Sequence, residues 1–193
     1  MSKKTSSNNT TTTRTSRSTS NSSLVRKTYH RGFALIKQNS RRVLVLYTGG
    51  TIGMAPSPRG YVCKAGYLPK LLCSLPMFHD PDYDLSQENI SMSTDSSSVV
   101  SEPLVTPLSE FDRRTVYYIK EYIPLLDSCN MVSTDWARVA KDILDNNNKF
   151  DAFIVLHGTD TMAYTASALS FMLENLSKTV VVTGSQIPLV RPR

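Results

Sequence analysis

The chain has 193 residues, of which 40% are hydrophobic, enough to bury the core of one domain, and its formal net charge is +6. Residues 1–42 hold ten Lys and Arg and no Asp or Glu, so the remainder, with twelve basic and sixteen acidic residues, is net negative. The positive charge belongs to the N-terminal segment and does not indicate that the body binds nucleic acid.

Cysteine usage and hydropathy exclude several classes of protein. The chain has three cysteines, Cys63, Cys73 and Cys129. Their odd number, and a spacing that does not match a metal site, favour reduced thiols in a reducing compartment. No apolar run approaches the ~20 residues of a membrane span, and the N-terminus lacks a secretory apolar segment. The sequence therefore predicts a cytoplasmic protein with no membrane partner and no metal.

Residues 1–41 have the composition of a disordered, basic tail. The first twenty-three are mostly Ser, Thr and Asn, and they bury too little apolar area to offset the entropy of ordering. Residues 24–41 are more apolar and free of acids, which is faintly similar to a mitochondrial transit peptide. A flexible, solvated tail is the interpretation that we favour.

Ordered structure is expected from Arg42 onward, in a domain that covers residues 42–193. Arg42–Thr48 is a nearly continuous apolar run, typical of a strand buried on both faces of a parallel sheet. Gly49–Gly53 follows as a tight turn, and Ala65–Leu75 predicts a short helix.

The next segment is rich in serine. Residues 80–112 combine a Ser-rich stretch with nearby prolines, which predicts a surface insertion of irregular structure near 84–112. Thr115–Ile123 alternates in part and is rich in Val, Tyr and Ile, so a second strand is expected there.

Helices and strands alternate in the second half. The expected elements are a helix capped by Ser133 or Thr134 that runs to about Asn146, a strand at Phe150–Leu156, a helix at Thr161–Asn175 and a strand at Thr179–Thr183. The helices carry apolar stripes, formed by Trp136, Val139, Ala140, Ile143 and Leu144 in the first and by Met162, Leu169, Met172 and Leu173 in the second.

This alternation predicts an α/β fold, a Rossmann-like or flavodoxin-like domain with a largely parallel sheet flanked by helices. In such sheets ligands bind beyond the carboxyl ends of the strands. The loops after Tyr47, Leu156 and Val182 are therefore the first places to look for chemistry.

The loop at Thr48–Gly53 reads Thr-Gly-Gly-Thr-Ile-Gly. Its glycines allow a sharp turn and place the Thr51 hydroxyl over the edge of the sheet. The spacing matches neither a phosphate-binding loop, which needs a lysine, nor the dinucleotide motif GxGxxG. A structural turn and a site for a ligand both remain open on this pattern alone.

The loop at His157–Thr161 crowds polar residues at the end of an apolar strand. Asp160 could cap the following helix, but a hydroxyl beside a carboxylate, as in Thr159 and Asp160, can also position a nucleophile or hold a substrate ammonium. His157 is interpreted as a structural histidine rather than a base.

Asp127 and Ser128 close a third loop, after the strand at Thr115–Ile123. A serine after an acid is usually a turn residue, and it gains interest only if this loop converges with the other two. The chain has no GxSxG elbow, which weakens a serine-hydrolase interpretation.

Three motifs together resemble a known family. TGGTIGM at 48–54, HGTDTMAYTASALSFMLENL at 157–176 and VVVTGSQIPL at 180–189 are similar to the bacterial-type L-asparaginases, above all to the cytoplasmic type I branch and its eukaryotic relatives. The resemblance runs from about Arg42 to Ile187, interrupted by the insertion, and its motifs are long and specific.

The resemblance implies a role for each site residue. Thr51 would attack the side-chain amide carbon of L-asparagine to form a β-aspartyl ester, with Tyr61 assisting it, and water would then release aspartate. The implied substrate-binding residues are Asp127, Ser128, Thr159 and Asp160, of which Ser128 binds the α-carboxylate and Asp160 the α-ammonium. Thr159 and Asp160 also count among the catalytic residues.

The resemblance also sets expectations for the whole protein. It implies no cofactor and no metal, a small-molecule substrate, and a homo-oligomer in the full-length protein. Cys129-Asn130-Met131 departs from the family's more common Ser-Asp-Met. The family's catalytic lysine is expected beyond residue 193, so the chain is expected to be a truncated N-terminal domain with little activity alone.

Two other functions stay open. Some eukaryotic relatives are named lysophospholipases, although the sequence shows neither a lipid-binding groove nor a serine elbow. A non-catalytic interaction protein would retain Thr51 and Asp160 only as elements of the fold.

Overall fold

The computed structural model describes residues 40–86, 88, 90–92 and 96–189, so residues 1–39 of the predicted tail lie outside the described residues. In chain order its elements are β1 (Ser40–Gly49), the 3-10 helix η1 (Thr51–Gly53), β2 (Ala55–Ser57), β3 (Gly60–Val62), α2 (Tyr67–Ser74), β4 (Ser98–Val100), β5 (Leu104–Val105), β6 (Arg114–Leu126), the 3-10 helix η2 (Ser128–Asn130), α3 (Ser133–Asp145), β7 (Ala152–Leu156), α4 (Met162–Met172) and β8 (Thr179–Thr183).

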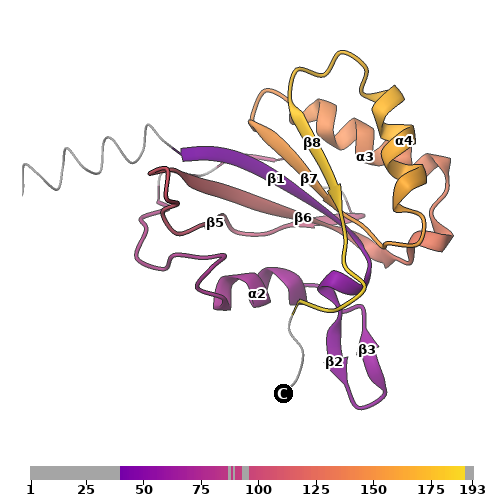
Figure 1. Cartoon of the computed structure of the whole chain (residues 1–193), viewed down its shortest axis with the longest axis horizontal. Coiled ribbons are helices and arrows are strands. Elements are labelled where there is room, and N and C mark those ends of the chain that lie inside the picture. Colours follow the sequence, from indigo (N-terminus) through magenta and orange to yellow (C-terminus); the bar gives the residue numbers. More distant parts are fainter. Residues whose placement is uncertain (1–39, 87, 89, 93–95, 190–193) are drawn as a thin grey trace, which may run out of the picture. The chain divides into compact units, whose positions relative to one another are not determined.

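The main sheet has the order β4-β6-β1-β7-β8, with β5 also paired to β6 (Figure 1). Strands β6, β1, β7 and β8 are parallel, whereas β4 and β5 run antiparallel to β6. Numbered along the chain, the parallel strands lie in the order 2-1-3-4, which is the flavodoxin-like arrangement. The expected α/β fold with a largely parallel sheet is confirmed.

Strand β1 lies in the middle of this sheet. Its pairing with β6 starts with Ser40 opposite Arg114, and its pairing with β7 starts with Val43 opposite Ala152. The strand order reverses between β1 and β7, and ligands of doubly wound sheets bind at such switch points. The loops that follow β1 and β7 therefore flank the position where a site is expected.

Alternate residues of β1 face two different helical layers. Leu44 and Leu46 belong to a buried cluster with residues of α3 and α4, whereas Val45 and Tyr47 pack in a second cluster with Leu68 and Leu72 of α2. Burial on both faces explains the nearly continuous apolar sequence of this strand. Figure 1 shows α3 and α4 beside β7 and β8, with α2 apart from them.

Two predictions about the first half are wrong in part. Strand β1 begins at Ser40 rather than Arg42, because backbone pairing with β6 extends the strand into polar residues. The segment 80–112 is not irregular throughout, since β4 and β5 extend the sheet and Leu104 and Val105 are buried. Antiparallel pairing at an edge uses backbone groups, so a Ser-rich sequence does not prevent it.

The predicted cap of α3 is also wrong. The N-cap residue is Val132, and Ser133 lies in the first turn. Asp135 takes over the capping, because its carboxylate accepts a hydrogen bond of 2.9 Å from the Val132 N–H. Leu144, expected in the apolar stripe, is exposed, since it lies off the face formed by Val139, Ala140 and Ile143.

The end of α4 shows a similar difference. The helix ends at Met172, and its buried residues are Thr165 and Leu169. Leu173, just after the helix, is buried as expected, but Met172 is exposed. None of the helices in the described part of the chain has the length and apolar character needed to cross a membrane.

Candidate active site

The loops after β1, β7 and β6 meet through closely approaching backbones. Gly50 has a φ of 91°, and a Cβ atom there would lie 2.6 Å from the Gly158 nitrogen. A Cβ atom on Gly158 would in turn lie 2.6 Å from Oγ of Ser128. No side chain fits at either glycine without displacing a neighbouring loop. The convergence on which the interpretation of Asp127 and Ser128 depended is therefore present.

A fourth loop joins the group from β8. A Cβ atom on Gly184 would lie 2.2 Å from the His157 carbonyl oxygen and 3.4 Å from Cγ2 of Thr159. The Thr161 hydroxyl donates a 2.7 Å hydrogen bond to the Ser128 carbonyl oxygen, which ties the loop after β7 to η2. Four loops at the carboxyl edge of the sheet thus form one packed unit.

The hydroxyl groups of the candidate residues lie at different depths in this unit. Ser128 opens η2 and is buried, with 4% of its surface exposed. Thr51 opens η1 and Thr159 follows β7, and both are half-buried. Asp127 and Asp160 are exposed. The three residues that carry the hydroxyl groups are therefore less exposed than the two carboxylate residues.

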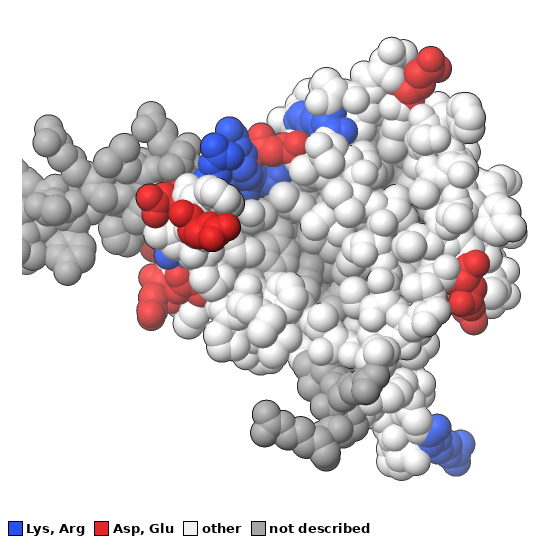
Figure 2. Space-filling model, in the orientation of Figure 1, with Lys and Arg blue, Asp and Glu red and all other residues white. Residues whose placement is uncertain are grey.

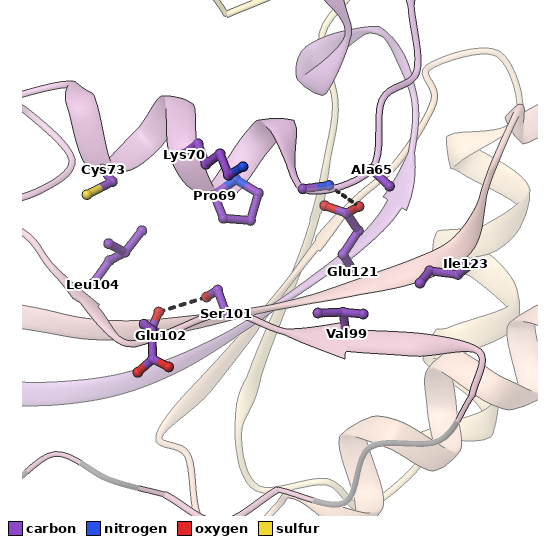
Figure 3. A pocket seen from close by; sticks show the side chains of 11 residues that line it. Ala65, Pro69, Lys70, Cys73, Val99, Ser101, Glu102, Leu104, Glu121 and Ile123 are labelled. Carbon is purple, nitrogen blue, oxygen red and sulfur yellow. Dashed lines mark hydrogen bonds between the residues drawn. The ribbon is translucent and has the colours of Figure 1, made fainter.

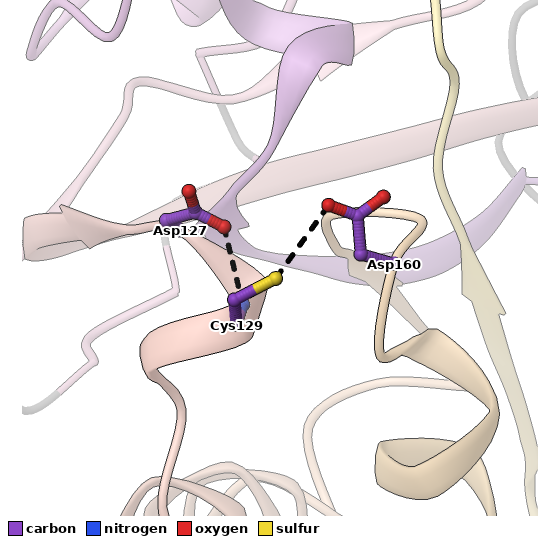
Figure 4. Close-up of side chains that lie close together, drawn as sticks. All are labelled: Asp127, Cys129 and Asp160. Atoms are coloured by element: carbon purple, nitrogen blue, oxygen red, sulfur yellow. Dashed lines mark hydrogen bonds between the residues drawn. The ribbon is translucent and has the colours of Figure 1, made fainter.

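The two carboxylates are linked through Cys129, one by its thiol and the other by its backbone N–H (Figure 4). Cys129 Sγ lies 3.6 Å from Oδ2 of Asp160, and the Cys129 N–H donates a 3.1 Å hydrogen bond to Oδ1 of Asp127. Desolvation raises the pKa of the Cys129 thiol, and the neighbouring Asp160 and Asp127 raise it further. The thiol therefore stays protonated and donates to Asp160.

The same three side chains are candidates for metal ligands, because their ligand atoms lie within 4.8 Å of one another. All three are exposed. Exposed acidic side chains commonly lie this close together without an ion. We assign no metal to this group.

His157 is fully buried and part of a chain of hydrogen bonds. Its Nδ1 lies 2.6 Å from the Gly158 carbonyl oxygen, which can only accept, so Nδ1 is the donor. In the neutral ring Nε2 then accepts from the Thr165 hydroxyl at 2.8 Å, and Thr165 accepts from Nε1 of Trp136 at 2.9 Å. This arrangement agrees with the structural role predicted for His157 and holds Gly158 in place.

Tyr61 is the one candidate residue that the structure does not bring to the others. It lies on β3, which forms a two-stranded hairpin with β2, apart from the main sheet, and 39% of its surface is exposed. Within the described residues no hydrogen bond joins Tyr61 to Thr51, Thr159 or Asp160. Figure 1 shows the hairpin of β2 and β3 projecting from the end of the sheet.

Cys63 is a neighbour of the site that sequence reasoning missed. Burial raises the pKa of its thiol, nearby Asp127 adds to this, and the Gly50 backbone N–H lowers it in part. The hairpin at 55–62 returns the chain from η1, so recognising this hairpin in the sequence would have placed Cys63 here. Because the pKa values of Cys63 and Cys129 are both raised, neither thiol is an activated nucleophile.

The fold and these loops define an α/β protein that presents serine and threonine hydroxyls beside carboxylates at the switch point of a parallel sheet. Residues 42–193 match the family described as "Asparaginase, N-terminal". The chain therefore belongs to the asparaginase family, of which it contains the N-terminal domain.

Individual relatives agree with this assignment. The chain is 44% identical to "L-asparaginase 1" of Escherichia coli K12 over 79% of its own length and 36% of that protein. It is 43% identical to "60 kDa lysophospholipase" of Mus musculus over 77% of its length and 24% of the relative. The crystal structure of L-asparaginase I from Vibrio cholerae is 44% identical, with a TM-score of 0.56, over 80% of this chain and 37% of that one. The chain thus spans 36% of the length of the first of these curated relatives and 24% of the length of the second.

Proposed function

We propose that the protein is an L-asparaginase, which hydrolyses L-asparagine to L-aspartate and ammonia through a threonine nucleophile. The observation that carries this proposal is the packing of three loops at the switch point, which brings the segments of Thr51, Ser128 and Thr159 together. Membership of the family and the names of its relatives support the same activity.

In the proposed reaction Thr51 Oγ1 attacks the side-chain amide carbon of asparagine. The threonine proton passes to the amide nitrogen, the C–N bond breaks and ammonia leaves, which produces an aspartyl ester on Thr51. Water then cleaves the ester and returns the proton to the threonine. Tyr61, with Thr159 and Asp160, assists the proton transfers; Tyr61 lies in the hairpin that follows η1, the element that Thr51 opens.

The substrate is oriented by groups of opposite character. The buried hydroxyl of Ser128 donates to the α-carboxylate, and the carboxylate of Asp160 accepts from the α-ammonium, with Asp127 and Thr159 beside them. The proposed mechanism uses no cofactor. We place the protein in the cytoplasm, where its three exposed, free cysteines would stay reduced, and we propose that it acts as a homo-oligomer.

The test measures ammonia release from asparagine by the protein at its full natural length. Thr51→Ala and Thr159→Ala should each lower kcat/KM by about a thousandfold or more, because members of a catalytic set act as a unit. Thr134→Ala, at an exposed threonine of α3, is the matched control and should leave the rate unchanged. Near-normal turnover by Thr51→Ala would disprove the nucleophile.

Hydrolysis of lysophospholipids is a second candidate, favoured by the name of the mouse relative. The same variants assayed with lysophosphatidylcholine distinguish the two activities. If neither substrate is hydrolysed by the unmodified protein, the third interpretation, a non-catalytic interaction protein, replaces both.

A further inference from the structure

Three hydrogen bonds connect α3 and α4 to the loop after β7. Nε1 of Trp136 in α3 donates to the hydroxyl oxygen of Thr165 in α4 at 2.9 Å, and this oxygen lies 2.8 Å from Nε2 of His157. Nδ1 of His157 lies 2.6 Å from the Gly158 carbonyl oxygen. Thr165 and His157 have no exposed surface. We call these four residues the relay.

Each end of the relay has one possible role. An indole N–H can only donate, and a backbone carbonyl oxygen can only accept. The Thr165 oxygen therefore accepts from Trp136, and its own proton is free to bond Nε2 of His157. The proton of the neutral ring then lies on Nδ1, toward Gly158. Every proton in the relay has one position, so the ring is held in one tautomer and one orientation.

The relay reaches the loop that carries Thr159 and Asp160. The far end of the same loop is also held, because the Thr161 hydroxyl donates a 2.7 Å hydrogen bond to the Ser128 carbonyl oxygen. Thr161 and Thr165 are one helical turn apart and so lie on one face of α4. The two ends of the loop are fixed from this face, with Thr159 and Asp160 between them.

Hydroxyl groups carry this task because α4 has no charged side chain. Its residues Met162–Met172 include no Asp, Glu, Lys or Arg, and Figure 2 shows mostly uncharged surface over this helix. Loss of the Thr165 hydroxyl would leave the indole N–H of Trp136 without an acceptor and Nε2 of His157 without a donor. Buried polar groups without partners are unfavourable, so the surrounding elements would shift.

We propose that Trp136 and Thr165 are positioning residues for the proposed hydrolysis. Neither belongs to the set that touches the substrate. Through the relay they fix the Gly158 carbonyl group, and with it the place of Thr159 and Asp160 in the next two positions. The proposal rests on the function assigned to those two residues, whereas the geometry of the relay can be tested without it.

The kinetic test uses the protein at its full natural length and Thr165→Val, which removes the hydroxyl at nearly constant volume. The value of kcat/KM for asparagine should fall by about tenfold or more, because the loop that holds the α-ammonium is no longer fixed. Thr165→Ser keeps the hydroxyl and should stay within about threefold of the unmodified protein. Ser170→Ala removes an exposed hydroxyl from the same helix and should have no effect.

A second readout reports on Asp160 without catalysis. The Cys129 thiol lies 3.6 Å from Oδ2 of Asp160, and after desolvation this contact is a cause of the raised pKa of the thiol. Displacement of Asp160 would populate the reactive thiolate. Alkylation of Cys129 by iodoacetamide at neutral pH should therefore be about threefold faster or more in Thr165→Val. Alkylation of Cys73, exposed on α2, should not change.

Glu121→Gln controls for a change to any buried polar group. Glu121 of β6 is buried, its Oε1 accepts a 2.7 Å hydrogen bond from the Gly66 N–H, and Figure 3 shows its carboxylate directed toward the loop that precedes α2. This bond lies on the α2 side of the sheet, away from the relay. The variant should leave the alkylation of Cys129 unchanged.

Trp136→Phe covers the case in which Thr165→Val does not fold. It removes only the indole donor, so kcat/KM should fall and alkylation of Cys129 should rise by about twofold or more. The proposal is wrong if the folded relay variant keeps normal rates, if Thr165→Ser is as impaired as Thr165→Val, or if Glu121→Gln speeds alkylation equally. If the unmodified protein does not hydrolyse asparagine, the proposed function fails, and the alkylation rates alone decide the relay.

Discussion

Gly158 has no side chain, yet it determines how closely the loop after β7 approaches η2. The nearest atoms to an added Cβ would be Oγ and Cβ of Ser128, at 2.6 and 2.7 Å. These are atoms of a short, buried side chain that cannot swing away. The separation between the Thr159 loop and the Ser128 loop is therefore set by the absence of one methyl group.

The first prediction concerns this position. Gly158→Ala should lower the free energy of unfolding by about 1–3 kcal/mol, because one loop must shift to admit the methyl group. Urea denaturation measures the change. Adding Ser128→Gly removes the colliding atoms and should restore part of the stability, although not substrate binding. A fully stable Gly158→Ala variant would show that the loops separate easily.

At the scale of single residues, only part of the candidate site could be predicted from the sequence. The convergence of Thr51, Ser128 and Thr159 could be predicted, because each follows a strand whose carboxyl end lies at one edge of the sheet. The place of Cys63 could not, since it depends on a hairpin without a strong hydrophobic pattern.

At the scale of elements, an ion pair between Asp80 and Arg114 links the segment after α2 to the start of β6. Nη1 of Arg114 lies 2.5 Å from Oδ2 of Asp80, and the Asp80 N–H donates to the Val105 carbonyl oxygen at 2.8 Å. The hydrogen bond from Arg114 lowers the pKa of the Asp80 carboxyl. The two partners are largely shielded from water, with 14% and 21% of their side chains exposed.

This pair predicts a pH dependence of stability. A carboxyl whose folded pKa is lowered stabilises the fold above its unfolded pKa and loses that contribution as pH falls through the folded value. Asp80→Asn should lower the free energy of unfolding at neutral pH by about 1–2 kcal/mol. The difference from the unmodified protein should shrink as pH falls below about 4.

Asp145→Asn is the control for this experiment. Its partner Lys141 lies one helical turn away in α3, and both side chains are at least half exposed, so little stability should be lost. Chemical denaturation of both variants at several pH values gives the comparison. A constant deficit of Asp80→Asn down to pH 2 would exclude the ion pair as its cause.

The elements differ in how well their sequence predicts them. Strands β1, β7 and β8 contain short apolar runs. Such runs are typical of strands in a parallel sheet that is covered on both faces. Strands β4 and β5 contain too few residues for a hydrophobic pattern, and they form because β6 offers an unpaired edge. Their existence depends on a partner strand and not on their own composition.

At the scale of the whole molecule, the charged residues are unevenly distributed along the chain. Residues 1–39 hold eight of the 22 Lys and Arg and none of the sixteen acidic residues. Their deletion leaves fourteen basic residues against sixteen acidic ones and thus reverses the sign of the net charge. Disorder of residues 1–39 stays a prediction from composition.

Deleting residues 1–39 tests that prediction. The Tm should stay within about 1 °C, because a segment with few large apolar groups and no acids contributes little to a core. At neutral pH the shortened protein should bind an anion exchanger, whereas the full chain binds a cation exchanger. A fall of several degrees in Tm would mean that residues 24–39 pack on the body.

The central position of β1 has a consequence for how the chain is made. This strand leaves the ribosome first, but its neighbour β6 starts at Arg114 and its other neighbour, β7, at Ala152. At about 5–20 residues per second, β1 waits on the order of 5–20 s for its second partner. During that time its apolar residues lack the strands that later cover their edges. The central position that buries β1 in the finished sheet therefore also means that its two edges are covered late in synthesis.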